Sequence, residues 1–191
     1  MSDKPVAAGK SSFDLIDPER LFTMLDLQPG AVVLDLACGT GRYSTALATA
    51  VGRQGKVFAV DLWQEGLELL DGEAQRCALA QIETLLADIR EPLPLPADSI
   101  DACLLATILH DLSADEQPRV IQETLRLLKP GGTLNIVEFK KLDHGPGPRM
   151  AIRLDATQID ALVAPYGFTR ANITELGDFT YLLQYTRSTE S

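Results

Sequence analysis

The sequence predicts an α/β fold, a doubly wound, mostly parallel sheet with helices on both of its faces. Two observations support this prediction. Short, nearly continuous apolar runs alternate five times with segments of helical spacing, which is typical of buried parallel strands joined by helices. The last two strand-like runs leave no room for a helix between them, so they must pair antiparallel to each other.

The first half of the chain supplies three of the expected strands. Residues 1–12 are small and polar, without the apolar core of a signal sequence, and we expect a disordered tail before a single domain over residues 13–191. The segment 13–27 has helical spacing that is interrupted near Pro18. The alternation that follows predicts strands over 31–37, 56–60 and 82–87 and helices over 42–51 and 64–80.

The second half continues the alternation and ends in a hairpin. The segment 91–99 contains three prolines, which exclude regular helix or central strand there. Ser113, with Glu116 three residues later, forms a capping-box pattern at the start of a helix. A loop rich in Gly and Pro occupies 140–150. The other expected elements are strands over 100–109, 133–139, 168–176 and 179–187 and helices from Ser113 to about Leu128 and over 155–164.

Composition narrows the classes of partner. The 27 acidic and 17 basic residues give a net charge of −10, which opposes a nucleic-acid surface because such a surface needs a basic face. No apolar run approaches the roughly 18–20 residues that a membrane helix needs. Three scattered cysteines and two histidines show no metal-ligand spacing and fit a reducing compartment. We therefore expect a cytoplasmic monomer or homodimer with a small-molecule partner, and no nucleic acid, membrane or metal.

The stretch VLDLACGTGR, residues 33–42, is the first candidate site. Ligands of open α/β sheets bind at the carboxyl ends of strands, and Gly39 and Gly41 allow backbone amides to approach a ligand closely. The helix that follows directs its positive end to the same place. An ordinary strand-to-helix turn, with glycines for geometry alone, is the alternative.

Asp61 ends the second strand, twenty residues after Gly41. A carboxylate at a strand end can accept both ribose hydroxyls of an adenosine; a helix N-cap is the alternative. Ser44 stands where a dinucleotide-binding loop has its third glycine. Asp35, an anion just before the loop, favours a cationic ammonium or sulfonium over a pyrophosphate. Together these residues predict an adenosine ligand and favour one with a cationic group.

Four motifs at these spacings resemble the class I S-adenosylmethionine-dependent methyltransferases, in particular small, single-domain, type 11-like members. They are VLDLACGTG, Asp61, Asp88-Ile89 after the third strand, and LKPGGTL before the fifth. The resemblance covers about residues 20–187. It implies a Rossmann-like, doubly wound seven-stranded sheet of order 3-2-1-4-5-7-6 with strand 7 antiparallel, and S-adenosylmethionine as the cofactor.

The resemblance also implies how the cofactor is held. The loop holds its methionine end, Asp61 its ribose, and Asp88 with the Ile89 amide its adenine amino group. Trp63 is either an adenine platform or a partly exposed cap, and Tyr43 either contacts the ligands or packs in its helix. Cys38 is interpreted as a small loop residue rather than a nucleophile. The implied cofactor-binding residues are Asp35, Ala37, Cys38, Gly39, Gly41, Tyr43, Asp61, Leu62, Trp63, Asp88, Ile89, Ala106 and Thr107.

His110 and Asp111 follow the fourth strand, where the family places the methyl acceptor. A histidine with a pKa near its free value of about 6.5 can take a proton from an acceptor hydroxyl or amine, so both residues are candidate catalytic groups. The alternative is a helix-start histidine bonded to a loop, since proximity and alignment alone supply much of the rate. The loop after the fifth strand, with His144, Arg149 and Arg153, either contacts the acceptor or is a stiff surface loop.

The sequence therefore predicts an S-adenosylmethionine-dependent methyltransferase with a small-molecule acceptor. A catalytically silent module that binds S-adenosylmethionine is one alternative, because no single residue is obligatory for methyl transfer. An NAD-dependent oxidoreductase is another, but it predicts a third loop glycine and a hydride-site pair such as Tyr and Lys, and neither is found. No residue pattern identifies the acceptor atom.

Overall fold

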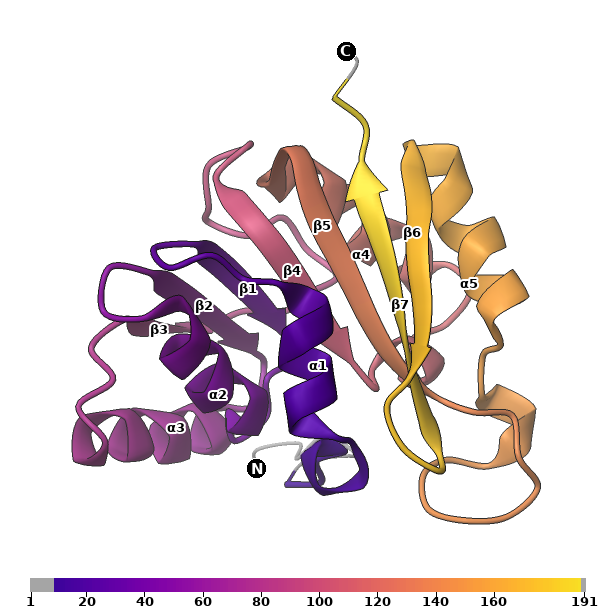
Figure 1. Ribbon diagram of the computed structural model, residues 1–191, viewed down its shortest axis with the longest axis horizontal. Coiled ribbons are helices and arrows are strands. Elements are labelled where there is room, and N and C mark those ends of the chain that lie inside the picture. Colours follow the sequence, from indigo (N-terminus) through magenta and orange to yellow (C-terminus); the bar gives the residue numbers. More distant parts are fainter. Residues whose placement is uncertain (1–8, 190–191) are drawn as a thin grey trace.

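A computed structural model describes residues 9–189 and shows one seven-stranded sheet between two layers of helices (Figure 1). The strand order is β3-β2-β1-β4-β5-β7-β6, which confirms the predicted order. The strands are β1 (Val32–Leu36), β2 (Lys56–Asp61), β3 (Ile82–Leu86), β4 (Ile100–Ala106), β5 (Leu128–Phe139), β6 (Phe168–Glu175) and β7 (Thr180–Arg187).

The first five strands run parallel and β7 runs antiparallel to both of its neighbours. At the centre of the sheet, Leu34 of β1 lies opposite Phe58 of β2 on one side and Cys103 of β4 on the other. The chain leaves β1 toward one edge of the sheet and returns to β4 toward the other. The carboxyl ends of β1 and β4 therefore flank the crevice in which open α/β sheets bind ligands.

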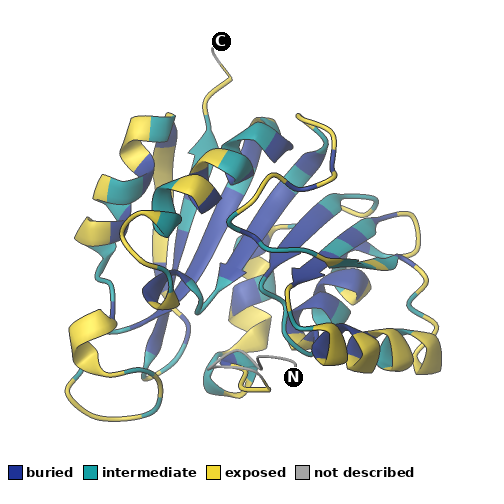
Figure 2. Ribbon diagram, turned by 180° about the vertical axis from the view of Figure 1, so that it is seen from behind, coloured by how far each residue is buried: buried dark blue, intermediate teal, exposed yellow. Residues whose placement is uncertain are grey.

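The helices divide between the two faces of the sheet (Figures 1 and 2). Leu21 and Leu47 bury one face, whereas Val120 and Ile159 bury the other. Buried apolar area on both faces, at roughly 25 cal/mol per Å², is the main stabilising term of such a layered domain. The α-helices are α1 (Pro18–Leu25), α2 (Arg42–Val51), α3 (Gln64–Arg76), α4 (Glu116–Leu127) and α5 (Ala156–Val163), with short 3₁₀ turns η1 (Phe13–Leu15), η2 (Leu109–Asp111), η3 (Met150–Ile152) and η4 (Ala164–Tyr166).

Element boundaries differ from the prediction where the backbone takes a left-handed conformation. Helix α3 ends at Arg76 rather than residue 80, just before Ala78 with a φ of 54°. Strand β4 ends at Ala106 rather than residue 109, because Thr107 has a φ of 55°. Strand β5 begins at Leu128, before the predicted Lys129–Gly132 turn, which is absorbed into an irregular stretch of its pairing with β4.

The predicted capping box forms only in part. The Glu116 carboxylate accepts the backbone N–H of Ser113 at 2.8 Å, but α4 begins at Glu116 and its N-cap is Asp115. A complete capping box lies at the start of α5, where Asp155 and Gln158 bond reciprocally. The spacing of Ser113 and Glu116 therefore predicted the helix start to within a few residues, but not its N-cap.

The N-terminal segment reaches the carboxyl edge of the parallel strands (Figure 1). Residues 1–8 of the predicted tail lie outside the described residues. Ser12 is only 4% exposed, and its hydroxyl bonds the side chains of Tyr43 and Thr107 at 2.9 and 3.1 Å. Ser12 therefore packs against the domain, although the predicted domain begins one residue later, at Phe13.

Candidate active site

The carboxyl ends of β1 to β5 gather the predicted site at one edge of the sheet, the lower edge in Figure 1. Parallel strands present their carboxyl ends on the same side, so residues far apart in sequence meet there. This edge carries the glycine loop after β1, Asp61 on β2, Asp88 after β3, Thr107 to Asp111 after β4, and Glu138 on β5.

Three alternate residues give the glycine loop its shape. Ala37, Gly39 and Gly41 have φ values of 58°, 57° and 75°, a left-handed region in which side chains other than hydrogen are strained. A Cβ atom on Gly41 would lie 2.3 Å from Leu70 Cδ1, whereas one on Gly39 would meet nothing within 4 Å. Gly41 is thus required for packing against α3, while Gly39 leaves its surface open to a ligand.

Asp35 lies beneath this loop with a fully buried carboxylate. The Ser44 hydroxyl donates to it at 2.5 Å, and within residues 9–189 it has no cationic partner. Burial and the nearby Asp61 charge raise the pKa of Asp35 to about 7, although the Ser44 hydrogen bond opposes this shift. Ser44, identified in the sequence only as a missing third glycine, is therefore the partner of Asp35.

Asp61 connects the glycine loop to the next helix. Its two carboxylate oxygens accept the backbone N–H groups of Gly39 at 2.7 Å and Trp63 at 2.8 Å. Each oxygen keeps one further acceptor position, so ribose hydroxyls can still bind there. Beside it, Leu62 is 48% exposed and Leu86, at the end of β3, is 59% exposed. These two side chains leave an apolar surface next to a hydroxyl-binding carboxylate.

Asp88 already has a charged partner that the sequence did not reveal. Arg90 donates to both of its carboxylate oxygens, at 2.6 to 3.0 Å, and also to Glu116 at 2.6 Å. The Arg90 hydrogen bonds lower the pKa of Asp88 below its usual value, despite partial burial. Ile89 is buried in the core. Asp88 is therefore a half-buried carboxylate held in place, and each of its oxygens already accepts two hydrogen bonds from Arg90, whose backbone N–H also donates to Oδ1 at 2.9 Å.

The side chains of Tyr43 and Thr107 both bond the Ser12 hydroxyl beside the glycine loop. The Tyr43 ring is buried and packs edge-to-face on Phe13, with ring centroids 5.0 Å apart. Ala106 and Thr107 are half-buried at the end of β4. Cys38 is half-buried in the loop, and burial with the charges of Asp35 and Asp61 raises its thiol pKa, which opposes a nucleophilic role.

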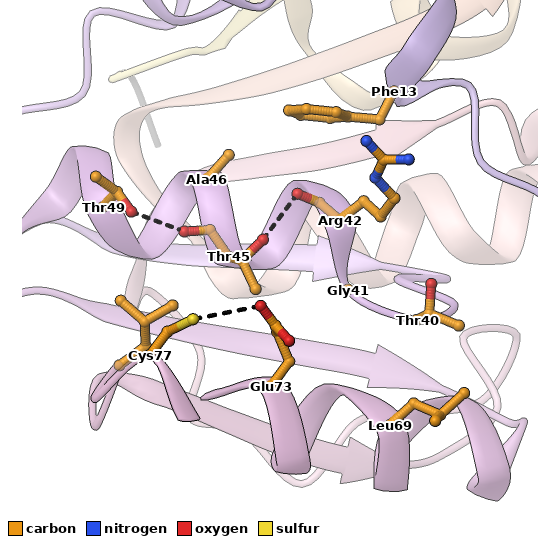
Figure 3. A pocket seen from close by; sticks show the side chains of 11 residues that line it. Phe13, Thr40, Gly41, Arg42, Thr45, Ala46, Thr49, Leu69, Glu73 and Cys77 are labelled. Atoms are coloured by element: carbon orange, nitrogen blue, oxygen red, sulfur yellow. Dashed lines mark hydrogen bonds between the residues drawn. The ribbon is translucent and has the colours of Figure 1, made fainter. Parts of the chain in front are cut away.

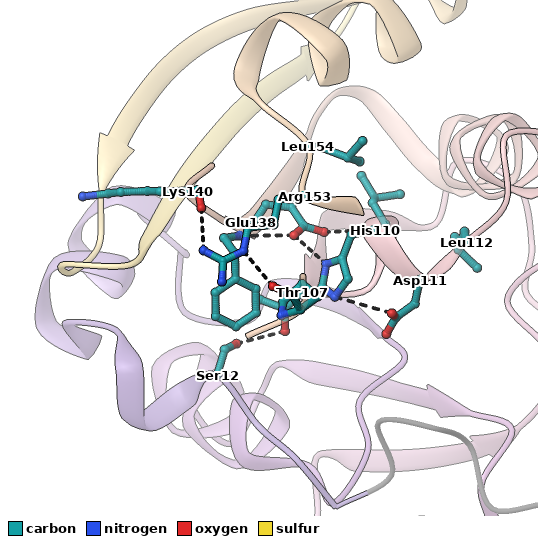
Figure 4. A network of polar contacts seen from close by, with 12 residues as sticks. Ser12, Thr107, His110, Asp111, Leu112, Glu138, Lys140, Arg153 and Leu154 are labelled. Carbon is teal, nitrogen blue, oxygen red and sulfur yellow. Dashed lines mark hydrogen bonds and ion pairs between the residues drawn. The ribbon is translucent and has the colours of Figure 1, made fainter. Parts of the chain in front are cut away.

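His110 is buried against β5 and is held by a residue that the sequence analysis did not identify. Its Nδ1 lies 2.7 Å from Glu138 Oε2, and its backbone N–H donates to Glu138 Oε1 at 3.3 Å (Figure 4). On the other side of the ring, Nε2 lies 3.6 Å from Asp111 Oδ1. Burial alone would lower the pKa of His110, but the Glu138 hydrogen bond and both carboxylate charges outweigh it and raise the pKa.

Arg153 fastens the loop after β5 instead of facing a ligand. Its guanidinium donates at 2.9 Å to the backbone carbonyls of Lys140, Pro146 and Pro148, and it stacks over the Phe139 ring. His144, by contrast, has a 70% exposed side chain and pairs with the neighbouring Asp143. The loop lies at the same edge of the sheet (Figure 1), but all three guanidinium nitrogens of its buried arginine donate to the loop itself.

A separate groove of about 720 Å³ lies between α2 and α3 (Figure 3). It shares Thr40 and Gly41 with the glycine loop, and it runs away from the sheet edge toward Glu73 and Cys77. Asp35, Asp61 and His110 do not line it. The acidic groups at the strand ends, rather than this groove, therefore define the candidate site.

Sequence reasoning missed the polar partners that arrive from distant segments. Glu138 and His110 are 28 residues apart, and Ser12 and Thr107 are 95 residues apart. A signal for Glu138 was present, because a carboxylate follows the apolar pair Ile136-Val137 within the predicted strand TLNIVEF, and buried acids are rare unless they are paired. No comparable pattern marks Ser12.

Comparison with protein families and curated proteins gives a consistent result. The model of a family described as "Methyltransferase domain" matches residues 33–132, just over half of the chain. The curated demethylmenaquinone methyltransferase of Bacillus cereus (strain B4264) is 33% identical over 115 residues, which cover 60% of this chain and 47% of the relative. The chain spans about half the length of the curated relatives that it matches.

Solved structures are similar over nearly the whole chain. A SAM-dependent methyltransferase from Aquifex aeolicus superposes with a TM-score of 0.83 and 24% identity, covering 96% of this chain and 94% of the other. A putative type 11 methyltransferase from Sulfolobus solfataricus has a TM-score of 0.74 and 25% identity, covering 93% and 95%. The first likeness supports the fold alone, across both halves of the sheet.

Proposed function

The chain belongs to the methyltransferase domain family, and on that premise we propose that it transfers the methyl group of S-adenosylmethionine to a small-molecule acceptor. Family membership confirms the methyltransferase predicted from the sequence and, with it, S-adenosylmethionine as the cofactor. We also propose roles for individual site residues and a class of acceptor. The main support is the buried Asp35 carboxylate beneath the glycine loop.

Asp35 fits the methionine end of the cofactor. A buried carboxylate without a cationic partner is unfavourable unless a ligand supplies the charge. The cofactor carries an ammonium and a sulfonium, so its binding compensates the Asp35 charge that burial disfavours. A pyrophosphate, as in NAD, would add repulsion instead. Ala37, Cys38, Gly39 and Gly41 shape the loop above this carboxylate.

The β2 and β3 strand ends fit the adenosine end. Asp61 retains acceptor positions for ribose hydroxyls, and the exposed Leu62 and Leu86 offer apolar area to an adenine ring. We assign the adenine amino group to Asp88, next to Ile89, where it would replace part of the hydrogen bonding from Arg90. We assign Trp63, Tyr43, Ala106 and Thr107 to the remaining walls of the cofactor site.

The acceptor is proposed to be a small molecule with an apolar ring, of the kind named in the demethylmenaquinone methyltransferase relatives. Met150 and Ile152 in η3 are exposed apolar side chains beside the loop that Arg153 fastens, and they offer contact area to such a ring. The net charge of −10 opposes a nucleic-acid substrate. In residues 9–189, no helix is both long and apolar enough to cross a membrane.

Bound S-adenosylmethionine supplies an electrophilic methyl carbon, whose bond to sulfur breaks as the acceptor's electron pair forms the new bond, with the sulfur keeping the old pair. The chain's own part is to bind, orient and exclude water. Holding the acceptor nucleophile in line with that carbon contributes much of the rate enhancement. The glycine loop and the Thr107–Asp111 segment lie on either side of the crevice at which the two ligands would meet.

Calorimetric titration with S-adenosylmethionine, S-adenosylhomocysteine and NAD tests this proposal. We expect saturable binding of the first two and none of NAD. Mass detection of S-adenosylhomocysteine, in the presence of reduced demethylmenaquinone with a short side chain and of a panel of other hydroxyl, amine and thiol acceptors, then tests turnover. Cofactor binding without turnover on any acceptor would favour the silent binding module, and NAD binding alone would favour the oxidoreductase.

A further inference from the structure

We propose that Glu138 is the positioning residue of a built general base, in which His110 Nε2 takes the proton of a hydroxyl group on the acceptor. The inference deepens the proposed methyltransferase function and rests on it. It names both the proton-accepting atom and the substrate class, a molecule whose nucleophile is an alcohol, phenol or enol.

Glu138 is fully buried at the carboxyl end of β5, and both of its oxygens are directed at the His110 segment (Figure 4). Oε1 accepts the backbone N–H of His110 at 3.3 Å, while Oε2 accepts the backbone N–H of Phe139 at 3.2 Å and lies 2.7 Å from His110 Nδ1. Isolating a carboxylate from water is costly unless such bonds are made. Here the carboxylate fixes the backbone and the ring of the same histidine.

These contacts determine which ring nitrogen of neutral His110 carries the proton. Because a carboxylate only accepts, the 2.7 Å contact requires the proton of neutral His110 to sit on Nδ1. Nε2 then carries the lone pair. The Phe139 ring, with its centroid 5.9 Å from that of His110, packs edge-to-face and limits rotation of the imidazole. A carboxylate that orients a histidine in this way is how acid–base residues are set up in many enzymes.

The charged groups around His110 come from three segments. Glu138 on β5 and Asp111 in η2 both favour the imidazolium, whereas Arg153 from the end of η3 opposes it. Tyr181 on β7 lies opposite Glu138 in the sheet, but its hydroxyl donates to the Leu154 carbonyl instead. The balance raises the pKa of His110, which strengthens it as a base.

A hydroxyl is the acceptor that needs such a base. A neutral amine can attack first and lose its proton afterwards, and a thiol ionises readily on its own, whereas a hydroxyl is a weak nucleophile until its proton leaves. In the step proposed, the O–H bond breaks with its electron pair left on oxygen, and the proton forms an N–H bond at Nε2. The imidazolium then lies between the carboxylates of Glu138 and Asp111. Because the Asp111 side chain is 34% exposed, it can pass the proton to solvent.

The competing explanation is a structural ion pair that only anchors the Thr107–Asp111 segment to β5. Both explanations predict that replacing Glu138 reduces stability, so stability alone does not separate them. They differ in whether the rate of methyl transfer depends on the protonation state of His110. If the pair is only structural, the rate does not change as His110 is protonated. If His110 is the base, the rate falls as His110 is protonated.

The titration of His110 by NMR is the first measurement, since the chain has two histidines and His144→Gln leaves one ring to assign. In that background, Glu138→Gln removes the charge and should move the His110 midpoint to lower pH by about one unit or more. Asp111→Asn should move it less, because Asp111 is farther away and partly exposed. An unchanged midpoint in Glu138→Gln would contradict the positioning role without reference to activity.

Turnover on reduced demethylmenaquinone with a short side chain, or on whichever hydroxyl acceptor the panel identifies, is the second measurement. His110→Asn should lower kcat by about 10²–10⁴-fold with little change in cofactor affinity. Glu138→Gln should lower the plateau of kcat/KM and move its acid limb to lower pH. Full kcat in His110→Asn, or transfer confined to amines or thiols, would overturn the inference. Failure to bind S-adenosylmethionine at all would instead overturn the proposed function.

Discussion

The two ends of the site edge differ in how their buried charges are held. At the β1–β2 end, the Asp35 carboxylate has one hydroxyl partner, and beside Asp61 the Leu62 side chain is left exposed. At the β4–β5 end, Glu138 makes two hydrogen bonds to His110 and one to Phe139, and Arg153 makes three to the carbonyls of its own loop. Among residues 9–189, no cationic side chain pairs with Asp35 at the first end, whereas the buried charges of the second end are hydrogen-bonded within the protein.

This difference is the basis for the two proposed roles, a ligand-binding surface at the β1–β2 end and a network that orients His110 at the β4–β5 end. Buried polar groups destabilise a fold unless they are paired, so the incomplete β1–β2 end favours a ligand that completes it. The satisfied β4–β5 end gains rigidity, and its strongest contacts fix the orientation of one imidazole. Each of the following variants tests whether the two ends behave in these two ways.

Asp35→Asn should have the largest effect, and it should be opposite for stability and for binding. Since the folded pKa of Asp35 is raised to about 7, the folded state keeps a proton that the unfolded chain loses above about pH 4, and stability falls as pH rises between these values. A shift of about 3 units corresponds to roughly 4 kcal/mol. Denaturant unfolding from pH 4 to 8 should show that the unfolding free energy of the variant changes less with pH than that of the unaltered protein. At pH 4 the variant should be no more stable than the unaltered protein.

The same variant should lose affinity for S-adenosylmethionine in calorimetry, because the cationic end loses its counter-charge. Glu83→Gln, at an exposed position on β3, is the control for net charge. Parallel pH profiles of the Asp35→Asn variant and the unaltered protein would remove the argument that Asp35 is a charge buried without its partner.

Gly41→Ala and Gly39→Ala form the second test, since both residues are left-handed but only one is closely packed. At Gly41, backbone strain and the contact with Leu70 should together cost about 2–4 kcal/mol of unfolding free energy. At Gly39, strain alone should cost about 1–2 kcal/mol. Cofactor affinity should fall in the folded Gly39→Ala protein, whose added methyl occupies the open surface. Equal stability losses would contradict the distinction.

The sequence identified the residues that the structure brings together at the β1–β2 end, but it missed Glu138 at the β4–β5 end, for a physical reason. Asp35, Gly39, Gly41 and Asp61 act within one strand–helix–strand unit, and their spacing is fixed by local geometry. Glu138 acts on His110 only after β4 and β5 have paired in register. Local patterns therefore locate the glycine turn and its nearby carboxylates, but not a partner such as Glu138 that strand pairing brings to His110.

The alternating apolar runs predicted a mostly parallel sheet with an antiparallel closing pair, and the family resemblance implied the strand order that the structure has. The element boundaries were less predictable. Ala78 and Thr107 adopt left-handed conformations, which the sequence does not indicate because neither residue is glycine. The segment Lys129–Gly132 has the sequence of a turn, although it lies within β5. Tertiary packing decided these positions against local preference.

Asp61→Asn should weaken S-adenosylmethionine binding by about 1–3 kcal/mol, the cost of ribose hydroxyls that lose a charged acceptor. The amide also brings an NH₂ group toward the Gly39 or Trp63 N–H that Asp61 now accepts, so the loop loosens as well. Asp71→Asn on the exposed side of α3, where Asp71 bonds only Thr84, makes the same change in charge. Equal affinities in the two variants would show that Asp61 contributes charge alone.

Arg153→Lys should have the smallest effect, and it tests whether the β4–β5 end is held together by its own hydrogen bonds. Lysine keeps the charge, but it cannot reproduce the fork that reaches the carbonyls of Lys140, Pro146 and Pro148. Because these loop carbonyls can rehydrate, the expected loss is about 1–2 kcal/mol. Trypsin should cleave within 140–153 faster than in the unaltered protein.

The matched control for this variant is Arg149→Lys, at an exposed position of the same loop. Both substitutions keep the number of tryptic sites, so only a change in loop opening alters the cleavage rate. Since Arg153 stacks on Phe139, which in turn packs on His110, Arg153→Lys should also broaden the His110 resonance. Equal cleavage rates in the two variants would mean that the loop is held by its prolines, and that the completeness of the β4–β5 end does not depend on Arg153.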